Sequence, residues 1–459
     1  MTTDIHHTTE LYANTLLREA GLSARVHCAP VHPAERAAQC GLMALTGRRE
    51  GPVEICPAPL AACADGVIAA LRSLDRCTKS NSASELNTLD GAALLGERAA
   101  SFGYARAGAV SSGGSCRLLA VKDGYLAINL ARDSDWELIP AWLEIESTRD
   151  WQILAQTLRS VALDSAITRG RLLGLAVCAM ASTPTDESSW FKRHYSIGAN
   201  SVAPARENKS PLVIDLSSLW AGPLCGHLLQ MLGARVIKVE SSERPDGARF
   251  GDKSFFDLLN ANKECVALPL NSQRGREQLR ELILRADIVI EASRPRALRQ
   301  MNIIAEEIIA KNPALTWLSI TGYGRDEPQA SWVAFGDDAG VAAGLSQLLF
   351  DTTGEIMFCA DAIADPLTGM HAALIAWASY LRGGGELIAL SLRDVVAHCA
   401  QFCGALDANS ARERYLDWRN YLQQSHTAVA PPRMRQPKTA ARALGADTQA
   451  VLAEFDIRC

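Results

Sequence analysis

One stretch, Pro211 to Glu240, constrains the fold of this chain more than any other. It opens with the apolar run Pro211-Leu-Val-Ile-Asp-Leu, which is typical of a buried strand. An apolar helix pattern follows from Ala221 to Ala234, and Arg235 to Glu240 reads as a second strand. A strand, a helix and a strand within about 30 residues form a βαβ unit, from which doubly wound sheets are built. We therefore predict an α/β fold with a doubly wound, mostly parallel, Rossmann-like sheet.

The same βαβ unit also indicates which class of ligand the sheet could bind, and where. It lacks the G-x-G-x-x-G fingerprint of dinucleotide-binding folds, so we do not expect NAD. Ligands of doubly wound sheets bind beyond the carboxyl ends of the strands. The residues after the predicted strands, such as Ser218 to Trp220 and Ala292 to Arg294, are therefore candidates for binding.

Length, charge and cysteine content narrow the remaining possibilities. The 459 residues suffice for two or three domains, and a hydrophobic content of 48% supports sizeable cores. The formal net charge of -5 gives no reason to expect nucleic acid or a membrane as partner. The 13 cysteines form no C-x-x-C pair and no secretory signal pattern opens the chain. We therefore expect a cytoplasmic protein without a metal site.

Residues Arg117 to Leu130 predict a β-hairpin, because two apolar runs flank Asp123-Gly124, a dipeptide that favours tight turns. An amphipathic helix pattern follows from Trp136 to Leu143, and two further helices are expected within residues 150–180. These elements predict a smaller α+β domain. The polar, proline-containing stretch 181–210 reads as a linker.

The chain contains an internal match. Shifted by 303 positions, Gly41 to Leu71 aligns without a gap on Gly344 to Leu374, with ten of 31 positions identical. This similarity favours descent from a tandem duplication, although shared composition of two glycine-turn-helix segments is the alternative. Ala62 occupies the position of Asp365, and alanine can be neither nucleophile nor base. We therefore expect the first copy to be catalytically silent.

Asp365 stands before Pro366 at the start of an apolar helix that runs to Leu381. Asp suits the N-cap of a helix, and Pro suits its first position. The positive end of the helix dipole would keep the carboxylate ionised. From these residues alone, Asp365 is either a cap or a functional carboxylate.

Both Pro211–Glu240 and Gly344–His371 resemble the class III CoA-transferases, the group that includes formyl-CoA and carnitine CoA-transferases and the alpha-methylacyl-CoA racemases. The second stretch matches the family's Gly/Ala-Asp-x-x-x-Gly motif, which implies that Asp365 is the catalytic residue. The first stretch matches the family's opening pattern at Asp215, Ala221-Gly222-Pro223, Gly233-Ala234 and Lys238 to Glu240.

The resemblance also implies substrates and binding residues. It implies an acyl-CoA and a small carboxylic acid as substrates, no permanently bound cofactor, and a homodimer. Gly113 and Gly114 stand where family members carry a glycine-rich loop over the active site, although a plain linker is the alternative. The family often has Asn-Phe where this chain has Ala292-Ser293. The residues expected to contact coenzyme A are Leu219, Trp220, Leu268, Asn271, Ala292, Ser293, Arg294 and Arg299.

Five segments follow from these observations, and the chain resembles a shortened tandem or permuted family member. They are a degenerate first-copy helical segment packed on the large domain (1–95), a small α+β domain (96–180), a linker (181–210), a large Rossmann-like CoA-binding domain with the catalytic Asp (211–403) and a C-terminal helical tail (404–459).

We predict a CoA-transferase that moves coenzyme A from an acyl-CoA to a carboxylic acid through a covalent intermediate on Asp365. A 2-methylacyl-CoA racemase is the first alternative. The histidine it needs would fall at Phe335, so His371 or His227 would have to replace it. A non-catalytic subunit with the same fold is the second alternative, motivated by Ala62.

Overall fold

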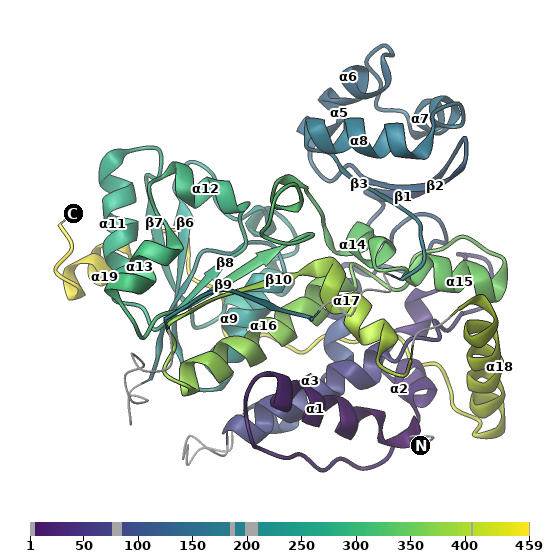
Figure 1. The fold of residues 1–459 in the computed structure, drawn as a ribbon, viewed down its shortest axis with the longest axis horizontal. Coiled ribbons are helices and arrows are strands. Elements are labelled where there is room, and N and C mark those ends of the chain that lie inside the picture. Colours follow the sequence, from purple (N-terminus) through teal and green to yellow (C-terminus); the bar gives the residue numbers. More distant parts are fainter. Residues whose placement is uncertain (1–4, 76–84, 184–188, 198–209, 405–406, 459) are drawn as a thin grey trace.

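The computed structural model describes residues 5–75, 85–183, 189–197, 210–404 and 407–458 (Figure 1). Its largest element is a seven-stranded sheet in the order β4-β10-β9-β8-β5-β6-β7. All neighbouring strands are parallel except β4, which pairs antiparallel with β10. The predicted mostly parallel sheet is therefore confirmed. The strands are β4 (Lys192–Ser196), β5 (Leu212–Asp215), β6 (Arg235–Ser241), β7 (Glu264–Leu268), β8 (Ile288–Glu291), β9 (Thr316–Thr321) and β10 (Glu386–Ser391).

Helices cover both faces of this sheet (Figure 1). On one face, α9 (Ala221–Met231) and α16 (Ala364–Leu381) pack on the strands and on each other. On the other face lie α11 (Gln273–Leu284), α13 (Ala305–Lys311) and the C-terminal α19 (Thr448–Glu454). Successive side chains of a strand point to opposite faces of the sheet, so Val213 of β5 packs in one core and Ile214 packs in the other. The chain therefore forms two buried apolar layers around one sheet, as a doubly wound fold requires.

The smaller domain is a three-stranded antiparallel sheet, β1-β2-β3, with helices on one face. The predicted hairpin is confirmed, but its turn is Lys122-Asp123, and Gly124 already belongs to the second strand. Pro140 accompanies a break in the single helix expected from Trp136 to Leu143, which forms two short helices instead. The elements are β1 (Cys116–Val121), β2 (Gly124–Asn129), α5 (Asp133–Glu137), α6 (Ile139–Leu143), α7 (Trp151–Leu158), α8 (Leu163–Leu173) and β3 (Ala176–Ala179).

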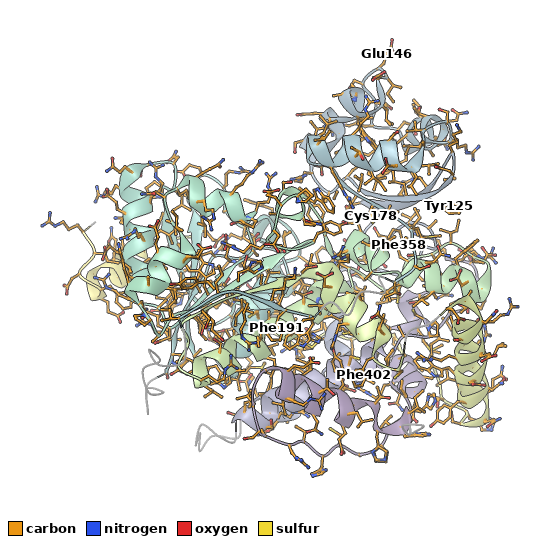
Figure 2. All side chains as sticks on the ribbon, viewed as in Figure 1. Tyr125, Glu146, Cys178, Phe191, Phe358 and Phe402 are labelled. Atoms are coloured by element: carbon orange, nitrogen blue, oxygen red, sulfur yellow. The ribbon has the colours of Figure 1, made fainter. Side chains whose placement is uncertain are left out.

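The other face of the small sheet rests on the large domain. Buried side chains from both sides meet there, and Figure 2 shows Tyr125, Cys178 and Phe358 at this junction. The helix α14 (Gly336–Ala342) lies directly against β2 and β3. The small domain is thus seated on the helix that follows β9 and η8 (Gln329–Ser331) in the chain.

The N-terminal region adds a layer of helices outside α16. Its elements α1 (Thr8–Glu19) and α3 (Leu60–Asp75) pack together, and α3 packs on α16 and on α17 (Leu392–Gln401). The helix α18 (Ala408–Gln424) closes this side against α2 (Pro33–Gln39) and α15 (Leu345–Thr353). The apolar residues of this layer are continuous with the core beneath α9 and α16.

The two matching sequence stretches have similar local structures. The bounds of α2 and α14 differ by the same 303 positions, and the glycines that follow them, Gly41 and Gly344, have φ of 92° and 96°. Gly66 of α3 lies against the Thr9 carbonyl of α1, and Gly369 of α16 lies against the Ala221 carbonyl of α9. A Cβ added to either glycine would stand only 2.9 or 2.5 Å, respectively, from that carbonyl oxygen. A glycine thus allows the same close helix crossing in each copy.

Part of the expected linker 181–210 lies outside the described residues, but its middle forms β4 at the edge of the large sheet. The expected polar connection therefore contains a strand. Within the described residues, no helix combines the length and apolar content needed to cross a lipid bilayer.

Candidate active site

A cavity of about 480 Å³ opens at the carboxyl ends of the parallel strands. Its walls include residues 218–222 after β5, 292–295 after β8 and 320–322 at the end of β9. The chain changes direction across the sheet between β5 and β8, because β6 and β7 lie on one side of β5 and β8 to β10 on the other. Ligands of doubly wound folds bind at such a switch point. The cavity therefore lies where the sequence pattern predicted a ligand.

Asp365 lies in the wall of this cavity and stays partly exposed there. The helix α16 begins at Ala364 with Ile363 as its N-cap, so the predicted N-cap role of Asp365 is wrong. The side chain stands in the first helical turn, and it accepts a hydrogen bond from the backbone N–H of Ala221 on α9. Gly336 leaves room for it, because a Cβ at that position would collide with Asp365 Oδ2 and with the Ala362 carbonyl. The carboxyl is therefore directed away from its own helix cap and toward the cavity.

The surroundings of Asp365 change its acidity. Its pKa is raised to about 7, mainly by burial and also by the nearby carboxylates of Asp337 and Asp361. The guanidinium of Arg98 and the backbone N–H of Ala221, at the start of α9, oppose this shift. The expectation that the helix dipole keeps Asp365 fully ionised is therefore corrected. Near neutral pH the carboxyl is divided between its protonated and ionised forms.

Arg98 is the cation nearest to this carboxylate cluster. It lies on α4 (Glu97–Phe102), lines the cavity and forms a bidentate ion pair with Asp361. Its Nε lies 2.9 Å from Asp361 Oδ2 and its Nη2 2.7 Å from Oδ1. Asp361 is fully buried just before α16. The pair therefore fixes the guanidinium beside the segment that holds Asp365.

A second carboxyl in the cavity wall belongs to Asp337, in the first turn of α14. Its Oδ1 accepts a hydrogen bond of 2.8 Å from the Ala362 backbone N–H. Burial and the charge of Asp361 raise its pKa to about 6, while Arg98 opposes the shift. Asp337 thus ties α14 to the turn that precedes Asp365.

The loop from Leu216 to Trp220 carries the opposite wall and leads into α9. Leu219 adopts a left-handed conformation, with φ of 67°, and is 44% exposed at the cavity. A bulky residue in that conformation is strained and must be held by its surroundings. Its backbone N–H donates a 3.0 Å hydrogen bond to Asp246 Oδ1. The Asp246 side chain therefore helps to set the entry of the chain into α9.

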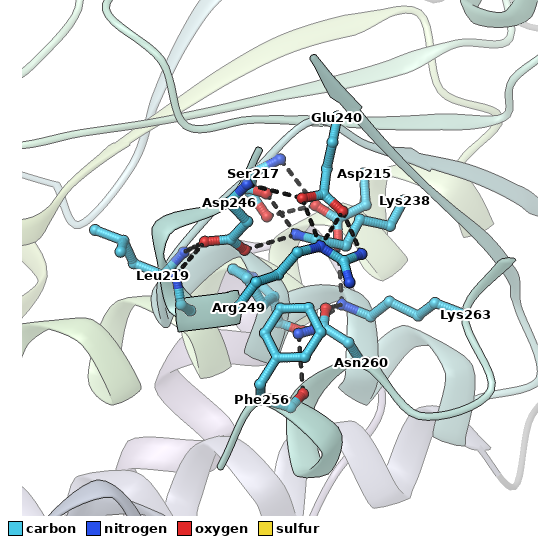
Figure 3. A network of polar contacts seen from close by, with 12 residues as sticks. Asp215, Ser217, Leu219, Lys238, Glu240, Asp246, Arg249, Phe256, Asn260 and Lys263 are labelled. Carbon is cyan, nitrogen blue, oxygen red and sulfur yellow. Dashed lines mark hydrogen bonds and ion pairs between the residues drawn. The ribbon is translucent and has the colours of Figure 1, made fainter. Parts of the chain in front are cut away.

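Asp246 belongs to a buried network of charged residues at the ends of β5 and β6 (Figure 3). Its Oδ2 lies 2.9 Å from Nζ of Lys238, which also donates to the Ser217 carbonyl at 2.8 Å. Lys263 Nζ lies 2.9 Å from Asp215 Oδ2. Pairing compensates the cost of burying these charges. The network holds the loop that forms one wall of the cavity.

The predicted coenzyme contacts divide into two groups. The structure brings together five of them in the cavity wall: Leu219, Trp220, Ala292, Ser293 and Arg294. Three others do not line the cavity. The Leu268 side chain is buried in the core, Asn271 follows β7, and Arg299 pairs with Glu306 at 2.6 Å on the surface.

Gly113 and Gly114 do not line the cavity either, whereas the next residue, Ser115, does. Gly113 lies close to Arg98 and Tyr104, since a Cβ built on it would stand 3.5 Å from each side chain. The glycine pair therefore lies beside the guanidinium of the site. Across the cavity, the small domain also contributes Asn129, Ala131 and Arg132 to the wall.

The two histidines considered for a racemase lie elsewhere. His371 is fully buried, and its Nε2 is 2.7 Å from the Tyr12 hydroxyl. His227 is also enclosed, with Nε2 3.1 Å from Arg435 Nη1. No histidine lines the cavity in the described part of the chain.

Comparison with known proteins agrees with this geometry. Residues 211–431 match the model described as CoA-transferase family III. This part of the chain is similar to CoA-transferase family III. Over 195 residues, the chain is 31% identical to formyl-CoA:oxalate CoA-transferases from Escherichia coli (strain CFT073) and Shigella boydii serotype 18. The alignments cover 40% of this chain and 47% of each relative, so the chain spans about half the length of the curated relatives it matches.

Two solved structures are also similar. A hypothetical protein from Mycobacterium tuberculosis is 27% identical, with a TM-score of 0.38, over 42% of this chain and 57% of that one. A CAIB/BAIF family protein from Brucella suis is 29% identical, with a TM-score of 0.37, over 49% of this chain and 58% of that one.

The family III motif identified Asp365, but sequence reasoning missed Arg98, Asp337 and Asp361. Arg98 stands in the N-terminal region, outside the family III match, and nothing in its neighbourhood signalled a function. Asp337 could have been found, because it lies two residues after Phe335, the position inspected for a histidine. Asp361 lies four residues before Asp365 and could have been considered with it.

Proposed function

We propose that this protein is a CoA-transferase that moves coenzyme A from an acyl-CoA donor to a carboxylic acid acceptor, with Asp365 as the covalent residue. One observation carries the proposal above the others. The Asp365 carboxyl lies in the wall of a cavity at the switch point of a family III sheet, beside the amino end of α9.

The arrangement suits nucleophilic catalysis at a thioester. An ionised Asp365 oxygen attacks the thioester carbonyl, the C–S bond breaks, and its electron pair leaves with CoA thiolate to give a mixed anhydride. The thiolate then attacks the Asp365 carbonyl carbon and releases the donor's carboxylate, which leaves an aspartyl thioester. The acceptor carboxylate attacks that thioester, the C–S bond breaks, and CoA thiolate leaves, which gives a second mixed anhydride between Asp365 and the acceptor. The thiolate then attacks the acceptor's acyl carbon and releases the Asp365 carboxylate.

Nearby groups support these steps. The backbone N–H groups of Ala221 and Gly222, at the amino end of α9, line the cavity and could stabilise a developing oxyanion. The enclosed position leaves the Asp365 carboxylate weakly solvated and hence reactive. Arg98 limits the resulting rise in its pKa. We therefore assign Arg98 a positioning and electrostatic role.

A trapping experiment tests the proposal. The purified protein is incubated with a panel of acyl-CoA donors, with and without carboxylic acids, and then with hydroxylamine. Transfer through Asp365 predicts a hydroxylamine-sensitive adduct that mass spectrometry locates on the peptide containing Asp365. Asp365→Ala and Asp365→Asn should lose both adduct and turnover while keeping the fold by circular dichroism. Near wild-type turnover in either variant would overturn the assignment.

Racemisation at the carbon next to the thioester is the second candidate. Asp337 favours it, because it places a second carboxyl in the cavity with a pKa of about 6. The absence of histidine from the described cavity wall favours transfer. Exchange of the α-hydrogen in deuterated water without an acceptor acid would indicate racemisation. Neither exchange nor transfer, together with no CoA binding, would indicate a non-catalytic subunit.

We further propose that the protein is a homodimer that acts in the cytoplasm, as the family resemblance implies. Light scattering after size-exclusion chromatography measures the first property, and fractionation of the source cells measures the second. A monomeric mass of 49.4 kDa at micromolar concentration would contradict the dimer.

A further inference from the structure

Two buried side chains meet where the small domain rests on the large one. Asn129 ends β2 and is 2% exposed, and Asp338 lies in the first turn of α14 and is fully buried. Asn129 Nδ2 donates a 3.2 Å hydrogen bond to Asp338 Oδ1, which also accepts a 2.9 Å bond from the Phe335 backbone N–H. The other oxygen of each side chain, Asn129 Oδ1 and Asp338 Oδ2, is buried without a hydrogen-bond partner.

A single proton on the Asp338 carboxyl would give both unpaired oxygens a hydrogen-bond partner. If Asp338 were a carboxylate, two unpaired acceptors would remain buried at the same junction, and each unsatisfied group is costly. A carboxylic acid has one hydroxyl donor, and an amide oxygen is an acceptor. The Asp338 hydroxyl can then donate to Asn129 Oδ1 while Asn129 Nδ2 donates to Asp338 Oδ1. Every polar atom of the pair gains a partner.

We propose that Asn129 and Asp338 form a cyclic amide–carboxylic acid pair that fastens the small domain to α14, with Asp338 protonated. The pair positions the cavity walls on both of its sides. Asn129 itself lines the cavity from the small domain, as Arg132 does. On the other side, Asp338 directly follows Asp337, which lines the cavity from α14.

Other contacts of the junction include apolar side chains, the Arg171 guanidinium over the rings of Tyr323 and Trp332, and a 3.0 Å backbone hydrogen bond from Phe358 to Gly108. Cys116, Cys178 and Met180 of the small domain meet Val341 and Phe358 of the large domain there. Cys178 Sγ donates to the backbone carbonyl of Asp338 at 3.2 Å, a weak hydrogen bond. The Asn129–Asp338 hydrogen bond ties β2 directly to α14, so loss of the acid–amide pair should loosen this part of the junction.

The pair has a pH dependence. Burial raises the pKa of Asp338 to about 7, the charge of Asp337 adds to the rise, and the hydrogen bonds from Phe335 and Asn129 oppose it. Since the closed junction binds the proton more tightly than an exposed aspartate does, closure is complete at low pH. Closure weakens as pH rises from the pKa of an exposed aspartate, 3.8, to about 7, where the proton is lost from the closed junction as well.

Neighbouring ionisable groups share this environment. The helices α15, α16 and α17 also pack against α14 and carry Asp351, Asp365 and Asp394. Besides burial, the charge of Asp337 on α14 raises the pKa of Asp338. Burial and, in turn, the charge of Asp338 raise the pKa values of Cys116 on β1, Cys178 on β3 and Tyr323 beyond β9.

Infrared spectroscopy tests the proton directly and needs no substrate. Protein labelled with ¹³C-aspartate should show a protonated carboxyl C=O band that is missing from Asp338→Asn and that titrates with a midpoint near pH 7. The exchanged double variant Asn129→Asp with Asp338→Asn rebuilds the pair in reverse and should restore such a band. If Asp338→Asn loses no protonated band at about pH 6, the proposal is wrong.

Hydrogen exchange tests the fastening. Amide exchange in β2 and β3 of the wild type should accelerate as pH rises toward about 7 and level off above it, after correction for the intrinsic pH dependence of exchange, because closure then no longer gains from binding the proton. Asp338→Asn keeps the amide geometry but cannot ionise, so its corrected exchange should not respond to pH. Asn129→Ala should exchange fast at every pH. Equal corrected pH responses in wild type and Asp338→Asn would overturn the fastening role.

The kinetic consequence rests on the proposed function. For transfer, kcat/KM for the acyl-CoA should fall above neutral pH in the wild type, and this alkaline fall should be absent from Asp338→Asn. An alkaline fall that persists in the variant would exclude Asp338 as its source. If no acyl-CoA is turned over at all, the proposed function fails, but infrared spectroscopy still decides whether the pair holds a proton.

Discussion

Arg98 and Asp361 are joined by two hydrogen bonds, 2.9 and 2.7 Å long, that connect α4 to the segment just before the proposed catalytic helix. Asp361 has no exposed surface, and the Arg98 side chain is 27% exposed. The N-terminal region, which lies outside the family match, thus supplies the main cation of the site. Changes in this region should therefore affect the chemistry at Asp365.

Replacement of Arg98 by alanine should destabilise the protein and make Asp365 a weaker acid. Loss of a partner from a buried ion pair costs about 3 kcal/mol or more in the free energy of unfolding. Removing the guanidinium also raises the pKa of Asp365, so the acid limb of the activity profile should move to higher pH. Urea unfolding and pH–rate profiles measure the two effects.

A surface ion pair provides the control for Arg98. Arg169→Ala breaks a contact with Glu144 in which the two side chains are 44% and 77% exposed. Such a pair contributes about 1 kcal/mol or less, and it does not touch the cavity. An Arg98→Ala variant that behaved like Arg169→Ala in both measurements would contradict the role of the buried pair.

The activity should depend on the ionisation of Asp365. Because burial raises its pKa to about 7, the nucleophilic carboxylate becomes predominant only above neutral pH. We expect single-turnover acylation, measured under donor excess, to slow about tenfold per pH unit well below that value. An acylation rate that stays constant down to about pH 5 would show that the carboxylate is already ionised there.

Gly336 should tolerate no side chain. A Cβ at this position would collide with Asp365 Oδ2 and the Ala362 carbonyl, so Gly336→Ala must displace the reactive carboxyl. We expect a loss of at least about 100-fold in kcat, since small misplacements of a reacting group are costly. Gly340→Ala on the same helix is the matched control, because its Cβ would meet only side-chain atoms, Ile363 Cγ2 at 3.0 Å and Leu345 Cδ1 at 3.9 Å. Similar kcat values in the two variants would refute the steric explanation.

The buried network behind the cavity should matter for both stability and substrate binding. Asp246→Ala leaves Lys238 without its 2.9 Å partner and removes the acceptor for the Leu219 N–H. The free energy of unfolding should fall by about 3–5 kcal/mol, as it does when other buried ion pairs lose one partner. Thermal unfolding and the KM for acyl-CoA check the two consequences. As a control, Glu281→Ala removes a partly exposed contact to Arg285, the residue that caps the end of α11. This contact is worth about 0.5 kcal/mol, so the variant should change neither thermal unfolding nor KM.

Sequence patterns located most of the large domain. The strands β5 and β6 and the helix α9 were predicted nearly to the residue, because apolar periodicity reports directly on burial. The strands β3 and β4 were missed. The strand β3 has only four residues and follows closely after Gly174, which ends α8, and β4 is a partly exposed edge strand that alternation does not mark. Neighbouring strands, rather than local sequence, determine both.

The start of α16 also could not be predicted correctly from local sequence. Asp365-Pro366 suits an N-cap followed by a first position, yet the helix begins two residues earlier at Ala364. The turn before it is fixed by contacts with other segments, such as the Ala362 N–H with Asp337 and Asp361 with Arg98. Local preference predicted the helix but not its register, because these distant contacts decide where it begins.

By itself, the sequence determined the parallel sheet and the small domain and singled out Asp365 as the proposed reactive carboxyl, since periodicity and motif spacing are local properties of the chain. Only the tertiary structure decided which charges surround that carboxyl. Arg98 and Asp337 approach it from segments far apart in the sequence. Burial and the charge of Asp337 raise the pKa of Asp365, and the charge of Arg98 lowers it. No pattern of neighbouring residues reports on such distances, so the acidity of Asp365 is a property of the fold.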